Sequence, residues 1–281
     1  MTSLVHRPVV AGYYYPAEAQ ALRQSLDESL RLARASTPQL PADARGVLLP
    51  HGDVRRAGRI VARTLARVRV PRCCLLLGPS HTDRSVGWSV MSSGWYRTPL
   101  GDVPIDTACA EALLSACPFL TPDLGAQRGE HAIEVLIPWL QRAGPSDLRI
   151  TPIIVGSEDG ELLRRFAEAL SRFLRSQDEP ILLIASTDLS HEEPQSRAAA
   201  LDSRLLAAIC AMDAEALREI VQGEGVRMCG LSAVIALLEA LQRLGARQAY
   251  VAASGSSVEA GGDPHAAIGY GGVVFASSAR G

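Results

Sequence analysis

The amino-acid sequence predicts an α/β fold, with one domain over residues 1–281 and a mainly parallel central sheet flanked by helices. Three short apolar runs carry this prediction, because each lacks the alternation of a half-exposed strand and leads to a histidine or an aspartate. Unalternating runs of this kind are typical of strands buried on both faces. Since ligands bind at the carboxyl edge of open α/β sheets, we expect these polar residues to gather there.

The first two runs are separated by a helical pattern at 57–67, in which apolar residues recur on one side. A strand, a helix and a strand in this order form a βαβ unit, so the two strands should be parallel and joined by a right-handed crossover. The runs, with the polar residues to which they lead, are 46–49 with His51, 73–77 with His81, and 180–186 with Asp188 and His191.

The remaining elements continue this alternation. A helix is expected at 16–35, because Pro16 suits a first helical turn and leucines recur every fourth residue. Between 86 and 106, short apolar pieces alternate with turn residues, which indicates a small antiparallel excursion. The other expected helices cover 107–117, a segment beginning at Glu130, 161–175, 196–212, 213–222 and 231–244, and the other expected strands cover 149–155, 248–253 and 267–275.

The composition is that of a globular protein, with 47% hydrophobic and 21% charged residues. The net charge of −2 indicates neither a nucleic-acid nor an anionic-membrane partner. The chain contains no lysine, which excludes Schiff-base lysine chemistry and a Walker-type phosphate loop. The six cysteines show no CxxC spacing, and no secretory signal or membrane-spanning stretch is recognisable, so we expect a cytoplasmic protein.

Several single residues have two interpretations. The tyrosines at 13–15 either pack the N-terminal segment on the body of the fold, or one of them lines a pocket. His131, between Glu130 and Glu134, is either an acid/base group of a pocket or a hydrogen-bonding residue at a helix start. Cys229 lies where a loop meets a helix, whose dipole would favour a thiolate, although a buried cysteine is usually a small core residue.

A set of short motifs runs in order through nearly the whole chain and resembles the MEMO family, named for a mediator of cell motility and including protein B of the AmmeMemoRadiSam system. The motifs are Arg7-Pro8, Val10-Ala-Gly12, Tyr15-Pro16, Pro50-His51, Leu77-Gly-Pro-Ser-His81, Thr98-Pro-Leu-Gly101 with Asp106, Glu130-His131 with Glu134 and Pro138, Ser186-Thr-Asp188 with His191, and Cys229-Gly230. Members of the family are similar to class III extradiol dioxygenases, which hold non-haem iron in an α/β fold, and the resemblance implies that fold here.

The resemblance also implies a mononuclear metal site with two further pocket residues. The ligands would be His51, His81 and Cys229, and the pocket residues Asp188 and His191. Partners implied by the resemblance are AMMECR-type and radical SAM proteins. The chain departs from the family at 52–56, where Gly-Asp-Val-Arg-Arg stands in place of Ala-Gly-Tyr followed by a second aromatic residue. An aromatic wall is thereby replaced by a carboxylate and two guanidinium groups.

Two imidazoles and a thiolate suit a borderline or soft ion, so we expect one iron or copper ion, with zinc as the alternative. Three protein ligands leave positions open for water, dioxygen or substrate, which is the arrangement of catalytic rather than structural sites. Asp188 could orient a ligating imidazole, and His131 or His191 could move protons, which makes these three the candidate catalytic residues.

We therefore expect a metal-dependent oxidoreductase or redox protein, similar to the dioxygenases, that acts on an unknown small molecule or peptide. Two alternatives stay open. The cleft could instead bind a peptide or protein without turnover, with Arg55 and Arg56 gripping a carboxylate or phosphate, or the ion could be zinc in a hydrolase. Turnover of a small molecule separates the first function from the second, and the identity of the metal separates it from the third.

Overall fold

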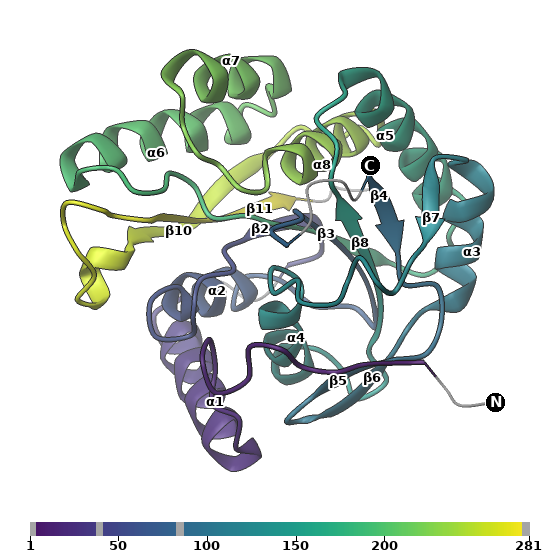
Figure 1. The fold of residues 1–281 in the computed structure, drawn as a ribbon, viewed down its shortest axis with the longest axis horizontal. Coiled ribbons are helices and arrows are strands. Elements are labelled where there is room, and N and C mark those ends of the chain that lie inside the picture. Colours follow the sequence, from purple (N-terminus) through teal and green to yellow (C-terminus); the bar gives the residue numbers. More distant parts are fainter. Residues whose placement is uncertain (1–3, 38–41, 83–86, 277–281) are drawn as a thin grey trace.

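The computed structural model describes residues 4–37, 42–82 and 87–276, and its largest feature is an eight-stranded sheet (Figure 1). The strand order is β10-β11-β2-β9-β3-β8-β4-β7. Helices cover both faces of this sheet, so the predicted α/β class is confirmed. In chain order the strands of this sheet are β2 (Ala44–Leu49), β3 (Cys73–Gly78), β4 (Trp88–Val90), β7 (Leu120–Pro122), β8 (Arg149–Val155), β9 (Ile181–Ser186), β10 (Ala249–Ser256) and β11 (Gly269–Ala276).

The centre of the sheet is parallel and its edges are mixed. Strands β2, β9, β3 and β8 run parallel to one another, whereas β11 is antiparallel to β2 and β10, and β4 is antiparallel to β8. The two strands of the predicted βαβ unit, β2 and β3, are parallel as expected, and β9 lies between them. This insertion brings the three strands that precede histidine or aspartate side by side.

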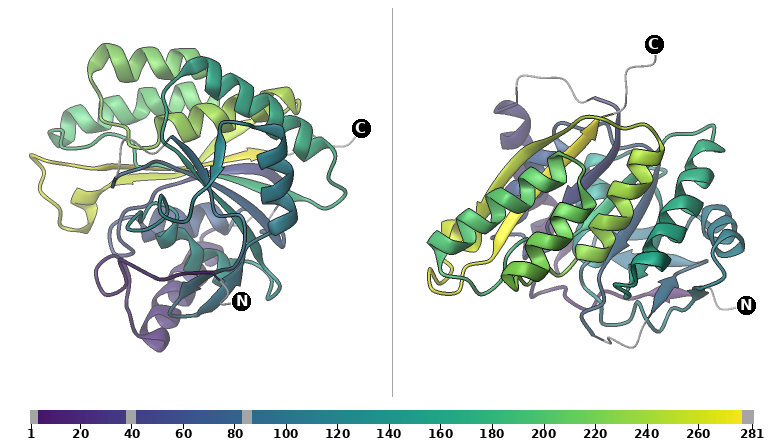
Figure 2. Two further views of the ribbon diagram at one scale, coloured as in Figure 1. Left: turned by 45° about the vertical axis from the view of Figure 1, so that its right-hand side comes forward. Right: turned by 90° about the horizontal axis from the view of Figure 1, so that it is seen from above.

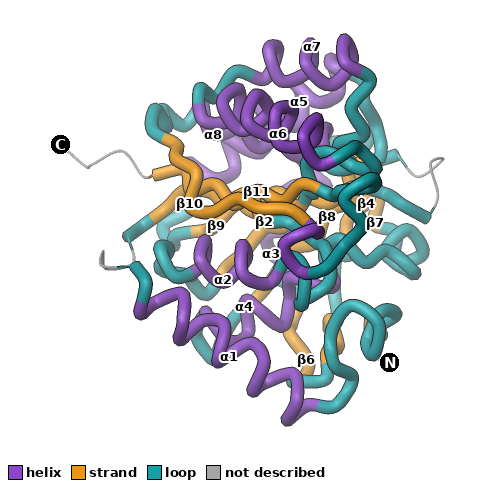
Figure 3. The backbone as a smooth tube through the Cα atoms, turned by 90° about the vertical axis from the view of Figure 1, so that its left-hand side faces the viewer, coloured by secondary structure: helices purple, strands orange, loops and turns teal. Residues whose placement is uncertain are grey.

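The helices form two layers, one on each face (Figures 2 and 3). Each layer packs on its own cluster of buried apolar side chains, so the sheet separates two halves of the core. One layer holds α1 (Ala19–Ala35), α2 (Gly58–Leu65) and α4 (Ile137–Ala143), and the other holds α3 (Thr107–Ala116), α5 (Gly160–Arg175), α6 (Gln195–Cys210), α7 (Ala214–Glu224) and α8 (Leu231–Arg243).

The first helix shows how local sequence sets an element. Leu22, Leu26 and Leu30 recur every fourth residue and are buried in a helix that packs on α2 and α4, which stabilises the fold by about 1.5–3 kcal/mol per side chain. The helix begins at Ala19 rather than at the expected residue 16. The reason is Glu18, whose carboxylate accepts the free N–H groups of the first turn and so caps the helix.

The predicted start of the helix at Glu130 is wrong. Glu130 lies in a loop, because its carboxylate accepts the backbone N–H groups of His81 and Ala132. A single 3₁₀ turn, η1 (Glu134–Leu136), follows before α4 begins. Most other predicted boundaries lie within three residues of those observed.

The antiparallel excursion expected at 86–106 is divided between two sheets, and its first residue lies outside the described ranges. Strand β4 joins the main sheet, while β5 (Trp95–Thr98) and β6 (Gly101–Pro104) form an antiparallel hairpin. Strand β1 (Val5–His6) adds to β5 in parallel and completes a separate three-stranded sheet. Within the described part of the chain, no helix has both the length and the apolar character needed to cross a bilayer.

Candidate metal centre

The carboxyl ends of β2, β9 and β3 meet at one edge of the sheet, and the start of α8 approaches the same point. His51 follows β2, His81 follows β3, and Cys229 lies two residues before the first residue of α8. One potential ligand atom from each of these residues lies within 4.8 Å of the other two. The cysteine Sγ is 3.2 Å from Nε2 of His51. The structure therefore brings together the three residues expected to bind a metal.

His51 is buried, and its environment fixes which ring nitrogen carries the proton. Its Nδ1 lies 2.9 Å from Oγ of Ser186, and that hydroxyl donates to the carbonyl oxygen of Ala132 at 2.6 Å. Since the serine proton is used in this bond, Ser186 accepts the Nδ1–H of His51, and Nε2 keeps its lone pair. Burial, with the neighbouring His81, lowers the pKa of His51 to about 3. The imidazole is therefore neutral, which is the form that ligates metals.

His81 is more exposed and is oriented by a carboxylate. Its Nδ1 donates to Oε1 of Glu130 at 2.8 Å, and its backbone N–H donates to Oε2 at 2.5 Å. Burial alone would raise the pKa of Glu130, but its hydrogen bonds outweigh this and lower the pKa to about 2. A carboxylate that accepts the second N–H of a histidine is the usual outer partner of a metal-ligating imidazole.

Cys229 reaches the site through a close approach of α8 to β9. A Cβ on residue 230 would meet the carbonyl oxygen of Ser186 at 2.4 Å, so only glycine fits there. The backbone N–H of Asp188 donates to Sγ at 3.3 Å. Burial and the charge of Asp188 nevertheless raise the pKa of the thiol to about 12, which corrects the expectation that the helix dipole favours a thiolate. A bound cation would reverse this balance.

The carboxylate of Asp188 accepts hydrogen bonds from backbone N–H groups and not from an imidazole. Its Oδ1 accepts the N–H groups of His51 at 2.9 Å and Gly52 at 3.2 Å, which fixes the turn after β2. The orienting role expected for Asp188 is instead taken by Ser186 and Glu130. Its other oxygen lies 3.7 Å from Nε2 of His191, a buried atom with no hydrogen-bond partner among the described residues.

His131 also faces this cluster. Its ring stacks on His81 at a centroid distance of 4.5 Å and lies 5.5 Å from His51. No helix begins at His131 itself, but its carbonyl oxygen accepts the N–H of Val135 in the turn that leads into α4, so both interpretations of His131 stay open. Burial, with the two neighbouring imidazoles, lowers the pKa of His131 to about 4. His131 forms a second close group with His81 and Glu130, but hydrogen-bond donors already occupy both oxygens of Glu130.

The N-terminal segment closes one side of the site. The buried carboxylate of Glu134 accepts the N–H groups of Val9 at 2.8 Å and Val10 at 3.0 Å, and the hydroxyl of Tyr15 at 2.6 Å. Tyr14 is thereby held with its ring 4.8 Å from that of His131. Tyr15 thus packs the segment on the body of the fold, as the first interpretation of the tyrosines expects, and Tyr14 contacts His131 beside the cluster.

Arg55 and Arg56, in the segment 52–56 that differs from the family pattern, direct their guanidinium groups largely to solvent. The Arg55 side chain is 89% exposed and that of Arg56 is 49% exposed. Asp53 accepts the backbone N–H groups of both arginines and so forms the turn before α2. Sequence reasoning assigned no role to Ser186, Glu130 or Glu134, although all three occur in the motifs of the resemblance. A buried polar residue beside a histidine motif was the signal available.

Comparison with known proteins gives a consistent result. The family model described as "Memo-like protein" matches residues 6–274. The MEMO1 family protein MK0963 of Methanopyrus kandleri is 33% identical over 276 residues, covering 95% of this chain and 98% of that one. A MEMO1 family protein of Aquifex aeolicus is 30% identical over 271 residues, covering 96% and 99%.

A solved structure supports the fold alone. The uncharacterized protein JW3007 of Escherichia coli K12 superposes with a TM-score of 0.53 at 18% identity, covering 82% of this chain and 98% of that one.

Proposed function

Because the chain belongs to the family of Memo-like proteins, we propose that it binds one iron or copper ion through His51, His81 and Cys229 and acts as a metal-dependent oxidoreductase. The observation that carries the proposal is the pair of outer hydrogen bonds. Ser186 and Glu130 each hold the Nδ1 of one histidine, and the Nε2 of His51 lies 3.2 Å from the sulfur of Cys229. Two imidazoles and one sulfur suit iron or copper.

The ion would supply electron exchange or the activation of dioxygen, and the chain supplies the surroundings. His81 is the exposed side of the cluster, so a substrate would enter there. His191 lies beside Asp188 with a free ring nitrogen, and His131 is held between Tyr14 and His81. Both imidazoles have lowered pKa values because of burial and are neutral at pH 7, so each is able to accept a proton from a substrate.

Metal analysis and visible spectroscopy test this function. The chain should bind about one ion when saturated with iron or copper, and a thiolate ligand should give a charge-transfer band in the visible range. Cys229→Ser should abolish the band and most of the stabilisation by metal, about 2.7 kcal/mol at a free metal concentration 100 times the dissociation constant.

Cys210→Ser is the matched control, since Cys210 is also a half-buried free cysteine but lies at the end of α6. It should keep the band and the affinity. A Cys229→Ser variant with unchanged spectrum and affinity would show that the sulfur is not a ligand. The zinc-hydrolase alternative uses the same three residues, and preferential retention of zinc together with hydrolytic turnover would favour it.

A further inference from the structure

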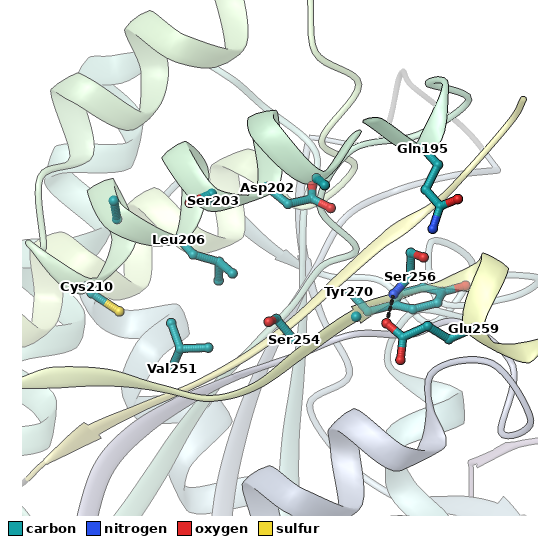
Figure 4. A pocket seen from close by; sticks show the side chains of 13 residues that line it. Gln195, Asp202, Ser203, Leu206, Cys210, Val251, Ser254, Ser256, Glu259 and Tyr270 are labelled. Atoms are coloured by element: carbon teal, nitrogen blue, oxygen red, sulfur yellow. Dashed lines mark hydrogen bonds between the residues drawn. The ribbon is translucent and has the colours of Figure 1, made fainter. Parts of the chain in front are cut away.

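A cavity of about 540 Å³ lies between α6 and the strands β10 and β11, beside the metal centre but distinct from it (Figure 4). Its volume is in the range of small-molecule binding sites, about 300–1,000 Å³. The strand β10 forms the edge of the main sheet, so the cavity opens on the side of the molecule. None of its lining residues has a role in the function proposed above.

The cavity has a polar end and an apolar end (Figure 4). Asp202, Gln195 and Glu259 gather at one end, near Tyr270, and the apolar side chains of Leu206 and Val251 lie toward the other. A ligand that fits such a cavity carries its polar group at one end of an apolar body.

The charge at the polar end comes from Asp202. This side chain is buried, with 9% of its surface exposed, and its Oδ1 accepts the N–H of Ser190 at 3.0 Å. Among the described residues, no arginine or histidine pairs with it, and no lining residue is basic. Glu259, in contrast, is neutralised by Arg59 and accepts the N–H of Ser256. Asp202 is therefore a buried carboxylate without a counter-charge.

A bound cation would stabilise a buried carboxylate of this kind. Burial raises the pKa of Asp202 to about 6, so the group is still ionised at neutral pH. A buried charge is costly unless it is paired, and a ligand that brings the opposite charge recovers that cost. An ammonium group also offers N–H donors, which the carboxylate and the amide oxygen of Gln195 can accept.

The inner wall of the cavity is the ring of Tyr270, and it connects the cavity to the metal centre. A Cβ on residue 52 would meet the Tyr270 hydroxyl at 2.9 Å, so this hydroxyl reaches the turn directly after His51. We propose that the cavity binds a small organic cation, whose ammonium group lies on Asp202 and whose apolar body lies along Leu206 and Val251.

Binding of three matched probes tests the proposal: 2-phenylethylammonium, the neutral 2-phenylethanol and the anionic 3-phenylpropanoate, each measured by calorimetry on the full chain. Charge-assisted hydrogen bonding should make the cation bind about 10-fold or more tightly than the alcohol. The anion should not bind measurably.

Three variants locate the site. Asp202→Asn keeps an oxygen to accept the Ser190 N–H and should remove the preference for the cation. Ala199→Phe, on the exposed side of α6 facing the cavity, should block the cation and the alcohol alike. Asp178→Asn, an exposed carboxylate in the turn before β9, is the matched control and should change nothing.

The proposal is overturned if the parent binds none of the probes or binds cation and alcohol equally. It is also overturned if Asp202→Asn, folded as judged by circular dichroism, keeps the full preference. Should Asp202→Asn fail to fold, Ala199→Phe decides alone, because unchanged binding of the cation in that variant places the ligand elsewhere.

Discussion

At the scale of single residues, a serine hydroxyl determines which nitrogen of His51 is free. Ser186 Oγ gives its own proton to Ala132 and can only accept from the imidazole. Ser186→Ala should therefore keep the fold and weaken metal affinity by roughly 10- to 100-fold, the range found when an outer partner of a ligand is removed. Ser171→Ala, which removes a buried hydroxyl from α5, should leave the affinity unchanged. Competition with a chelator measures both, and equal affinities would exclude this role.

The cluster of His51, His81 and Cys229 could be expected from the resemblance and from the positions of these residues after strands or before a helix. The partners that orient them could not. Ser186 faces His51 only because Leu49 of β2 pairs with Ser186 of β9, and this register depends on strand order. Glu130 stands beside a histidine motif, but its pairing with His81 spans 49 positions of the chain and so does not follow from a local pattern.

At the scale of elements, the N-terminal segment depends on one carboxylate. Glu134 accepts three hydrogen bonds from Val9, Val10 and Tyr15. In Glu134→Gln the amide N–H₂ would face a donor, so we expect a loss of about 1.5–3 kcal/mol in the free energy of unfolding, measured with urea. Faster hydrogen exchange at Val9 and Val10 should accompany it.

Glu219→Gln is the control for this change, because Glu219 is an exposed glutamate of α7. It should alter neither stability nor exchange. If Glu134→Gln behaved like Glu219→Gln, the segment would be held by its apolar contacts and not by the carboxylate.

Helix α6 gives a prediction for pH. The folded pKa of Asp202, about 6, lies above its ordinary value of 3.8, so folding favours the protonated form. The contribution of Asp202 to stability is complete at pH values below its ordinary pKa. This contribution is lost as the pH rises through the folded pKa. Relative to Asp202→Asn, the parent should thus lose up to about 3 kcal/mol between pH 4 and pH 7 without added ligand. Urea unfolding of both proteins across this range measures it, and a constant difference would contradict it.

The elements most easily predicted are helices with one buried face and strands buried on both faces. The helix α5 and the strand β8 match their expected positions closely, since their apolar patterns are long and unbroken. The loop at Glu130 was missed because a hydrogen-bonded carboxylate, and not a helix-breaking residue, prevents the helix there.

At the scale of the whole molecule, strand order was beyond the reach of local patterns. Convergence of polar residues at one sheet edge could be expected from the parallel arrangement alone. The position of β9 between β2 and β3 could not, because β9 comes from the second half of the chain and pairs by long-range packing. The same long-range packing places α8, and with it Cys229, over the end of β9.

The distance along the chain between the proposed ligands also sets when their cluster can form during biosynthesis. His51 and Cys229 are 178 positions apart. At about 5–20 residues per second, a ribosome needs roughly 10 to 35 s to add the sulfur after the first imidazole. A nascent chain that has not reached α8 carries two of the three ligands and also lacks β10 and β11. Loading with the proposed ion would therefore be an event of the nearly finished polypeptide, and a prematurely terminated product would be released without a complete His/His/Cys cluster.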